Sequence, residues 1–224
     1  MNLPNYLTAA RILLVPILVV ILLTPFSEAV LGINAYTLAI VIFMVASLTD
    51  FLDGHLARRR NQVSDLGKLL DPIADKLLVS AALIVLVEKE LAPAWAVVVI
   101  IGREFIVTGL RSVAAVGGVI IQAQMSGKIK MWAQCVAIVA LLVAGANGSH
   151  PVSNFGQQLP LLTFWEVPEV RRALADLASF SVSSEDWQVF GYIIGRAGLW
   201  VSVATSLWSM TDYIRYFAAT KKAD

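Results

Sequence analysis

Six apolar runs constrain the fold of this chain more than any other feature. They cover residues 7–24, 35–48, 77–87, 94–116, 131–146 and 189–210. A helix that crosses a bilayer needs about 20 mostly apolar residues, and the chain is 58% hydrophobic but only 15% charged. We therefore expect an all-α, polytopic membrane protein in which six transmembrane helices form a single membrane-embedded domain over residues 1–224.

Basic residues mark every second connection between these runs. Connection 25–34 has no Lys or Arg, whereas the next connection contains Arg58, Arg59 and Arg60. The fourth connection and the C-terminal tail are basic again, with Arg111, Lys128, Lys130, Arg215, Lys221 and Lys222. By the positive-inside rule, both termini should lie in the cytoplasm. The first run lacks a separate basic leader and a cleavage site, so we expect a retained helix and a multi-pass protein of a bacterial inner membrane.

The fifth connection, residues 147–188, is longer than the others, and we expect it to be extracytoplasmic. Pro168 is suited to the first turn of a helix. Val170, Leu174 and Leu177 would share one face of that helix, which is the pattern of a helix that lies in a membrane interface.

Cysteine content and charge exclude two other classes of protein. Cys135 is the only cysteine, so the chain is not a disulfide-stapled secreted domain. Its formal net charge is +1, which gives no strong field to attract nucleic acid. The charged residues that remain are costly inside a membrane and are expected to be functional.

Acidic residues gather in the connection between the second and third runs. Five of the sixteen lie in residues 50–75. Asp50 and Asp53 are three residues apart, and Asp71 and Asp75 are four apart, so each pair shares a face of its helix. If the chain turns back near residues 59–64, the two pairs face each other across a narrow gap.

Four such carboxylates cannot all stay ionised and unpaired at low dielectric. Either their pKa values rise or cations bind between them. An all-carboxylate set without a His or Cys cluster suits Mg²⁺ or Mn²⁺ rather than Zn²⁺, and it is large enough for a two-metal site. The alternative is a solvated connection in which the acids pair with Arg58, Arg59, Arg60, Lys68 and Lys76.

The full pattern over residues 50–75 resembles the signature of the CDP-alcohol phosphotransferases. This signature, Asp-x2-Asp-Gly-x2-Ala-Arg-x8-Gly-x3-Asp-x3-Asp, is filled by Asp50, Asp53, Gly54, Ala57, Arg58, Gly67, Asp71 and Asp75. The resemblance implies a six-helix homodimeric enzyme that transfers a phosphoalcohol group from a CDP-linked donor and releases CMP. It also implies that Asp50, Asp53, Asp71 and Asp75 bind the metal ions.

The same resemblance assigns further roles within the signature. It makes Asp75 the general base, and Gly54, Ala57, Arg58 and Gly67 the residues that shape the nucleotide site. A carboxylate near the acceptor hydroxyl is suited to take its proton in the transition state.

Three further segments resemble the members of this family that join CDP-diacylglycerol to sn-glycerol 3-phosphate. They contain Leu3-Pro4-Asn5 with Arg11, Arg103-Glu104 with Arg111, and Gly127-Lys128 with Lys130 and Gln134. A glycerol phosphate is a dianion and needs cations near the metal ions. We expect its phosphate to contact Arg103, Arg111, Lys128 and Lys130, since Arg binds phosphate bidentately and Lys adds a point charge.

Other interpretations of these residues remain open. The four basic residues could instead be ordinary positive-inside anchors. Within the same enzyme class, the alternative function is that of a cardiolipin synthase or of a phosphatidylinositol-type synthase. These enzymes differ from the first in the acceptor that they use. Outside it, a divalent-cation transporter also places carboxylates in helices, although such a protein needs acids along a path to both faces, and here they cluster on one side.

Overall fold

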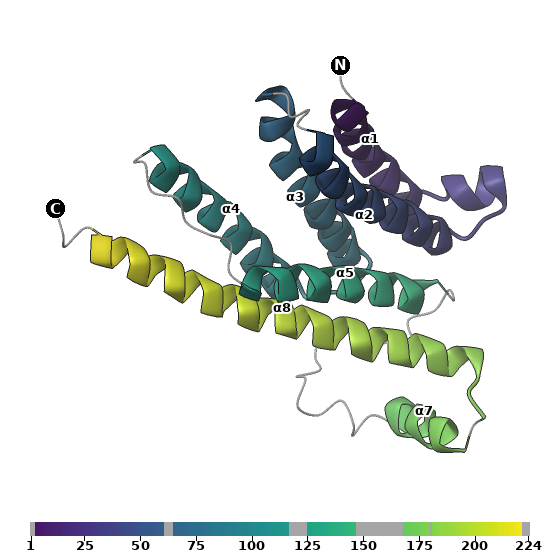
Figure 1. Cartoon of the computed structure of the whole chain (residues 1–224). Coiled ribbons are helices and arrows are strands. Elements are labelled where there is room, and N and C mark those ends of the chain that lie inside the picture. Colours follow the sequence, from purple (N-terminus) through teal and green to yellow (C-terminus); the bar gives the residue numbers. More distant parts are fainter. Residues whose placement is uncertain (1–2, 61–64, 117–124, 147–167, 180, 221–224) are drawn as a thin grey trace.

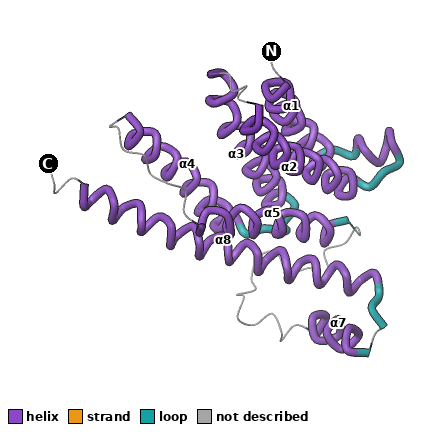
Figure 2. Tube along the Cα trace, viewed as in Figure 1, coloured by secondary structure: helices purple, strands orange, loops and turns teal. Residues whose placement is uncertain are grey.

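The computed structural model describes residues 3–60, 65–116, 125–146, 168–179 and 181–220, and every regular element among them is helical (Figures 1 and 2). The helices are α1 (Leu3–Leu23), the short π-helix η1 (Ser27–Leu31), α2 (Ala35–Arg60), α3 (Asp65–Glu88), α4 (Ala94–Val116), α5 (Met125–Gly145), α7 (Pro168–Ala178) and α8 (Ser184–Thr220). The prediction of an all-α fold is confirmed for these residues. Each of the six apolar runs corresponds to one of the six long helices, and the runs 7–24 and 131–146 extend one residue past the ends of α1 and α5.

The first three long helices form one layer of the bundle, in which α1 packs against both α2 and α3 (Figure 1). Gly32, with a φ of 63°, ends η1 in a left-handed conformation that favours glycine. Asn34 then caps α2, because its Oδ1 accepts the backbone N–H of Tyr36 at 2.9 Å. The amide nitrogen of Asn34 also donates to the Ala146 carbonyl at 2.8 Å, which ties the start of α2 to the end of α5.

The other layer is built on the long pair α5 and α8 (Figure 1). Glycines of α8 lie directly against α5. A Cβ atom placed on Gly191 would lie 2.9 Å from the Ala140 carbonyl oxygen, and one on Gly198 would lie 2.9 Å from the Ala137 Cβ. Small residues allow two helix backbones to approach closely, which is how helices associate when lipid surrounds them. Helix α4 packs on the same α8, and α2 joins the two layers through α5.

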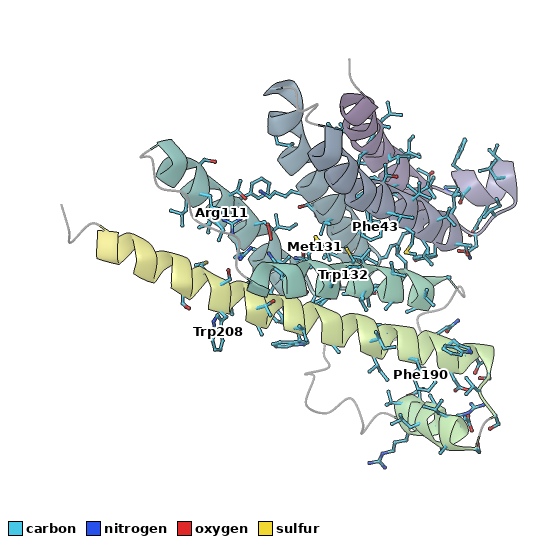
Figure 3. All side chains as sticks on the ribbon, in the orientation of Figure 1. Phe43, Arg111, Met131, Trp132, Phe190 and Trp208 are labelled. Atoms are coloured by element: carbon cyan, nitrogen blue, oxygen red, sulfur yellow. The ribbon has the colours of Figure 1, made fainter. Side chains whose placement is uncertain are left out.

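Buried apolar side chains from seven helices form one continuous core, whose largest fully buried member is Phe43 of α2. Many large apolar side chains also remain exposed on the outside of the bundle. Trp208, which is 72% exposed, projects from α8 away from α4 and α5 (Figure 3). A soluble monomer rarely exposes so much contiguous apolar surface, so a lipid environment suits this exterior.

The described part of the chain contains one segment that is long and apolar enough to cross a membrane, Glu185–Thr211 in α8. Shorter apolar helical stretches cover Thr8–Leu23, Ala35–Thr49 and Lys130–Gly145. The long helices and the apolar exterior are consistent with a membrane protein.

The prediction that Pro168 begins a helix is also confirmed. Helix α7 starts at Pro168 and packs on the first turns of α8 (Figure 1). Val170 and Ala173 are buried in that contact, whereas Leu174 and Leu177 stay exposed. The rest of the predicted long connection, residues 147–167, lies outside the described residues.

Candidate active site

The signature residues lie on two consecutive helices, at the end of α2 and at the start of α3. Asp50, Asp53, Gly54, Ala57 and Arg58 belong to the last three turns of α2, whereas Gly67, Asp71 and Asp75 belong to the first three turns of α3. Helix α2 runs toward the end at which α3 begins (Figure 1). The prediction that each aspartate pair lies on a helix is therefore confirmed at the level of the backbone.

The carboxylates themselves lie outside the described side chains, so their distances from one another remain a prediction. The ligand type still allows a chemical test. All four candidate ligands are carboxylates, which are the hard oxygen donors that Mg²⁺ and Mn²⁺ prefer. A spacing of three or four residues on a continuous helix places each pair on one face. The residues present therefore fit a divalent metal site.

Lys76 connects the signature helix to α4. It directly follows Asp75, and its Nζ donates a hydrogen bond to the hydroxyl of Thr108. That hydroxyl in turn donates to the backbone carbonyl of Glu104 at 2.7 Å. Because of these two bonds, the turn of α4 that contains Glu104 is fixed beside the helix that contains the proposed base.

Glu104 joins two cations that come from different helices. Its Oε1 accepts a hydrogen bond from Arg103 Nη1 at 3.1 Å and another from Lys130 Nζ of α5. Arg103 Nη2 donates to the Ser209 hydroxyl of α8 at 2.5 Å. Arg103 is 8% exposed and Lys130 only 2%, so both charges are held inside the bundle. We call Lys76, Arg103, Glu104, Lys130 and Ser209 the basic cluster.

The basic cluster has more positive than negative charge. Its two buried cations, Arg103 and Lys130, and the carboxylate of Glu104 between them sum to +1 when all are ionised. Burying unbalanced charge is expensive, so such groups in membrane helices usually mark a substrate path. Buried polar atoms also lack a partner among the described residues: Arg103 Nε, Gln134 Nε2 and Ser206 Oγ, from α4, α5 and α8. Gln134 lies one turn from Lys130, and Ser206 one turn from Ser209, so the cluster is suited to bind an additional anionic group.

The structure brings together two of the four cations predicted to bind the acceptor phosphate, Arg103 and Lys130. Arg111 lies on α4 about 12 Å farther along the helix axis than Arg103, and its side chain is exposed (Figure 3). Lys128 lies in the first turn of α5, and its side chain is outside the described set.

Sequence reasoning missed two hydroxyl groups of this site, those of Thr108 and Ser209. Ser209 is 106 residues from Arg103, so no local pattern links the pair. A weaker signal was present in α8, where the buried residues Ser202, Ser206 and Ser209 are four and three residues apart and share one face of an otherwise apolar helix.

Comparison with known proteins identifies the class of enzyme. Residues 1–167, which include the whole signature, match the family model described as CDP-alcohol phosphatidyltransferase. The chain belongs to this family. It is therefore an enzyme, a CDP-alcohol phosphatidyltransferase, and the predicted resemblance is confirmed.

Three relatives of this chain are named for the same activity. The chain is 53% identical over 148 residues to the CDP-diacylglycerol–glycerol-3-phosphate 3-phosphatidyltransferase of Bacillus subtilis, which covers 63% of this chain and 77% of that protein. It is 43% identical over 149 residues to the Rickettsia bellii protein of the same name, covering 66% and 78%. The protein of that name from Pseudomonas fluorescens is 32% identical over 221 residues, covering 96% and 89%.

Proposed function

We propose that this phosphatidyltransferase transfers the phosphatidyl group of CDP-diacylglycerol to sn-glycerol 3-phosphate, giving phosphatidylglycerophosphate and CMP. Its relatives from Bacillus subtilis, Rickettsia bellii and Pseudomonas fluorescens are named for this reaction. The single structural observation that supports it is the buried basic cluster, which contains Arg103 and Lys130.

The choice of acceptor follows from the charge of the cluster. A glycerol phosphate is a dianion at neutral pH, and the excess positive charge of Arg103 and Lys130 over Glu104 attracts it. Arg103 Nε and Gln134 Nε2 are buried N–H donors without a partner among the described residues, and phosphate oxygens are strong acceptors. An uncharged acceptor such as inositol would leave the excess charge of this site unbalanced.

We assign the binding of the donor, CDP-diacylglycerol, to the signature residues. We propose that Asp50, Asp53, Asp71 and Asp75 bind a pair of divalent ions, Mg²⁺ or Mn²⁺. Such ions neutralise the diphosphate of the donor and stabilise CMP as the leaving group. Gly54, Ala57 and Gly67 leave room for the nucleotide, and Arg58 supplies a positive charge to it.

We assign to Asp75 the role of removing the proton from the acceptor hydroxyl. As the hydroxyl oxygen attacks the phosphorus of the phosphatidyl group, the carboxylate of Asp75 takes the proton and the bond to CMP breaks. The adjacent Lys76 binds Thr108 of α4 and so links the helix of this base to the helix that contains Arg103 and Glu104. The acceptor phosphate would thus be held on α4 and α5 while its hydroxyl reaches α3.

The membrane arrangement is part of the same proposal. We propose that α1, α2, α3, α4, α5 and α8 all span the inner membrane as one catalytic domain over residues 1–224, with both termini in the cytoplasm. The proposal also includes a homodimer as the assembled form. The exposed apolar residues along these helices support contact with lipid.

An acceptor panel tests the proposed function. Membranes containing the protein are incubated with CDP-diacylglycerol and Mg²⁺, and CMP release is measured with one acceptor at a time. We expect release with sn-glycerol 3-phosphate and little with inositol or phosphatidylglycerol. Release with one of the latter but not with sn-glycerol 3-phosphate would replace the proposed acceptor, and metal flux into proteoliposomes without CMP release would replace the enzyme by a transporter.

A further inference from the structure

Helix α7 is an amphipathic element that the family model does not include, since that match ends at residue 167. Val170, Ala173, Leu174 and Leu177 follow the spacing that forms one apolar stripe on a helix. Val170 and Ala173 are fully buried in the core that includes Val189 and Tyr192 of α8. Leu174 and Leu177 are 45% and 52% exposed, so α8 covers only part of the stripe.

Hydrogen bonds close both helix ends at the turn between α7 and α8. The Ser181 N–H donates to the Asp176 carbonyl at 2.9 Å and closes the end of α7. At the start of α8, the Ser183 N–H and hydroxyl both donate to Asp186 Oδ2 at 2.7 Å, and the Asp186 N–H donates to the Ser183 hydroxyl at 3.3 Å. This reciprocal capping box fixes the start of α8.

Helix α7 packs beside the start of Glu185–Thr211, which is the segment of α8 that is long and apolar enough to cross a membrane. Trp187 lies in the first turn of that segment, is 62% exposed, and makes an edge-on contact with Phe190 at a centroid distance of 6.3 Å. Figure 3 shows Phe190 at the end of α8 that is nearest to α7. Exposed tryptophans at helix ends are typical of the level of the lipid headgroups.

A second element exposes apolar residues at the same end of the bundle. η1 and its flanking residues include Phe26, Val30, Leu31 and Ile33, each between 43% and 63% exposed. Asn34, which follows them, binds the Ala146 carbonyl at the end of α5, and α5 lies against Gly191 of α8. A membrane surface at this end would therefore contact both η1 and α7.

We propose that α7 is an interfacial helix, and that Leu174 and Leu177 insert into the lipid surface beside the start of α8. Its charged residues, Glu169, Arg171, Arg172 and Asp176, sum to zero, and Arg172 pairs with Asp176 at 3.7 Å. Attraction to anionic lipid therefore contributes little, and insertion depends on the apolar side chains. The occupant of this surface is the bilayer, and the proposal holds whichever acceptor the enzyme uses.

Site-specific probes test the insertion. In a Cys135→Ala background, Leu174→Cys, Leu177→Cys and the matched control Ala175→Cys each receive an environment-sensitive fluorophore. Ala175 is exposed on the opposite face of α7, so its substitution disturbs the packing as little as the other two. Each full-length protein is reconstituted into zwitterionic phosphatidylcholine vesicles that contain a quencher on the lipid acyl chains.

The probes at positions 174 and 177 should lose most of their emission to the acyl-chain quencher, whereas the probe at 175 should keep most of its emission. The same contrast is expected after anionic lipid is added. Equal quenching at all three positions would overturn the proposal, as would a contrast that appears only with anionic lipid. Emission that resists the lipid quencher but changes with the protein-to-lipid ratio would assign this face to a second copy of the chain instead.

Discussion

At the scale of the residue, the balance of charge around Glu104 is the most informative feature of the site. One carboxylate oxygen accepts hydrogen bonds from both Arg103 and Lys130, so the two cations remain close together in spite of their repulsion. Because the carboxylate neutralises only one of them, the cluster keeps the excess positive charge that a phosphate can balance. Glu104 is a positioning residue on this account, since it acts through its two basic neighbours.

The metal assignment leads to a first prediction at this scale. Asp71→Ala should reduce metal-dependent transfer by more than about 100-fold, because loss of a direct ligand should exceed the 10- to 100-fold cost of losing an outer-shell partner. The measurement is CMP release as a function of Mg²⁺ concentration. Asp65→Ala is the matched control, because Asp65 lies on the same helix but outside the signature, and it should stay close to wild type. Similar losses in both variants would contradict the assignment.

The role of Asp75 leads to a second prediction. Asp75→Asn keeps the shape of the side chain but removes the base, so kcat should fall by about 10²- to 10⁴-fold. Binding of CDP-diacylglycerol should change far less, which a titration with the purified variant can measure. An equal loss of donor binding and turnover would instead make Asp75 mainly a metal ligand.

At the scale of the element, hydropathy located the helices but not their full lengths. The apolar runs at 35–48 and 77–87 correspond to α2 (Ala35–Arg60) and α3 (Asp65–Glu88), which are much longer. The charged residues of the signature lower the hydropathy of these segments without breaking the helices, because Leu, Ala, Arg and Lys are all good helix formers. An apolar run therefore marks the part of a helix that meets lipid or core, and the polar extensions contain the signature residues.

Replacing a glycine inside a helix by alanine usually stabilises the helix. The contact between α5 and α8 predicts the opposite effect at Gly191. Gly191→Ala should lower the melting temperature, because the added Cβ would lie 2.9 Å from the Ala140 carbonyl oxygen and 3.3 Å from the Ala144 nitrogen, and backbone atoms cannot move aside cheaply. Gly109→Ala is the control, since a Cβ there meets nothing within 4 Å. It should be neutral or stabilising by up to about 1 kcal/mol.

Thermal unfolding of both variants in the same detergent provides the comparison. If Gly191→Ala proved as stable as Gly109→Ala, the close approach of α5 and α8 at this position would be wrong.

At the scale of the whole molecule, the sequence predicted the parts of the site that lie close together along the chain. The signature occupies one short stretch, and Arg103 and Lys130 were predicted because their segments resemble those of related enzymes and because a glycerol phosphate needs cations near the metal ions. Thr108 and Ser209 were not found, because their roles depend on how α3 and α8 pack against α4, which no local spacing encodes. The structure thereby adds the connection between the signature and the basic cluster, which passes through Lys76.

The account places the acceptor phosphate in the basic cluster, and steady-state kinetics of Lys130→Met tests this most directly. A hydrogen bond to a charged group contributes about 1.5–3 kcal/mol, and each 1.4 kcal/mol is about tenfold in affinity. The KM for sn-glycerol 3-phosphate should therefore rise about 10- to 100-fold, whereas the KM for CDP-diacylglycerol should stay unchanged, and Lys130→Arg should restore part of the loss. Lys89→Met, in the turn after α3, should leave both values at the wild-type level. An unchanged KM for sn-glycerol 3-phosphate, or an equal rise for both substrates, would contradict the assignment of this cluster to the acceptor.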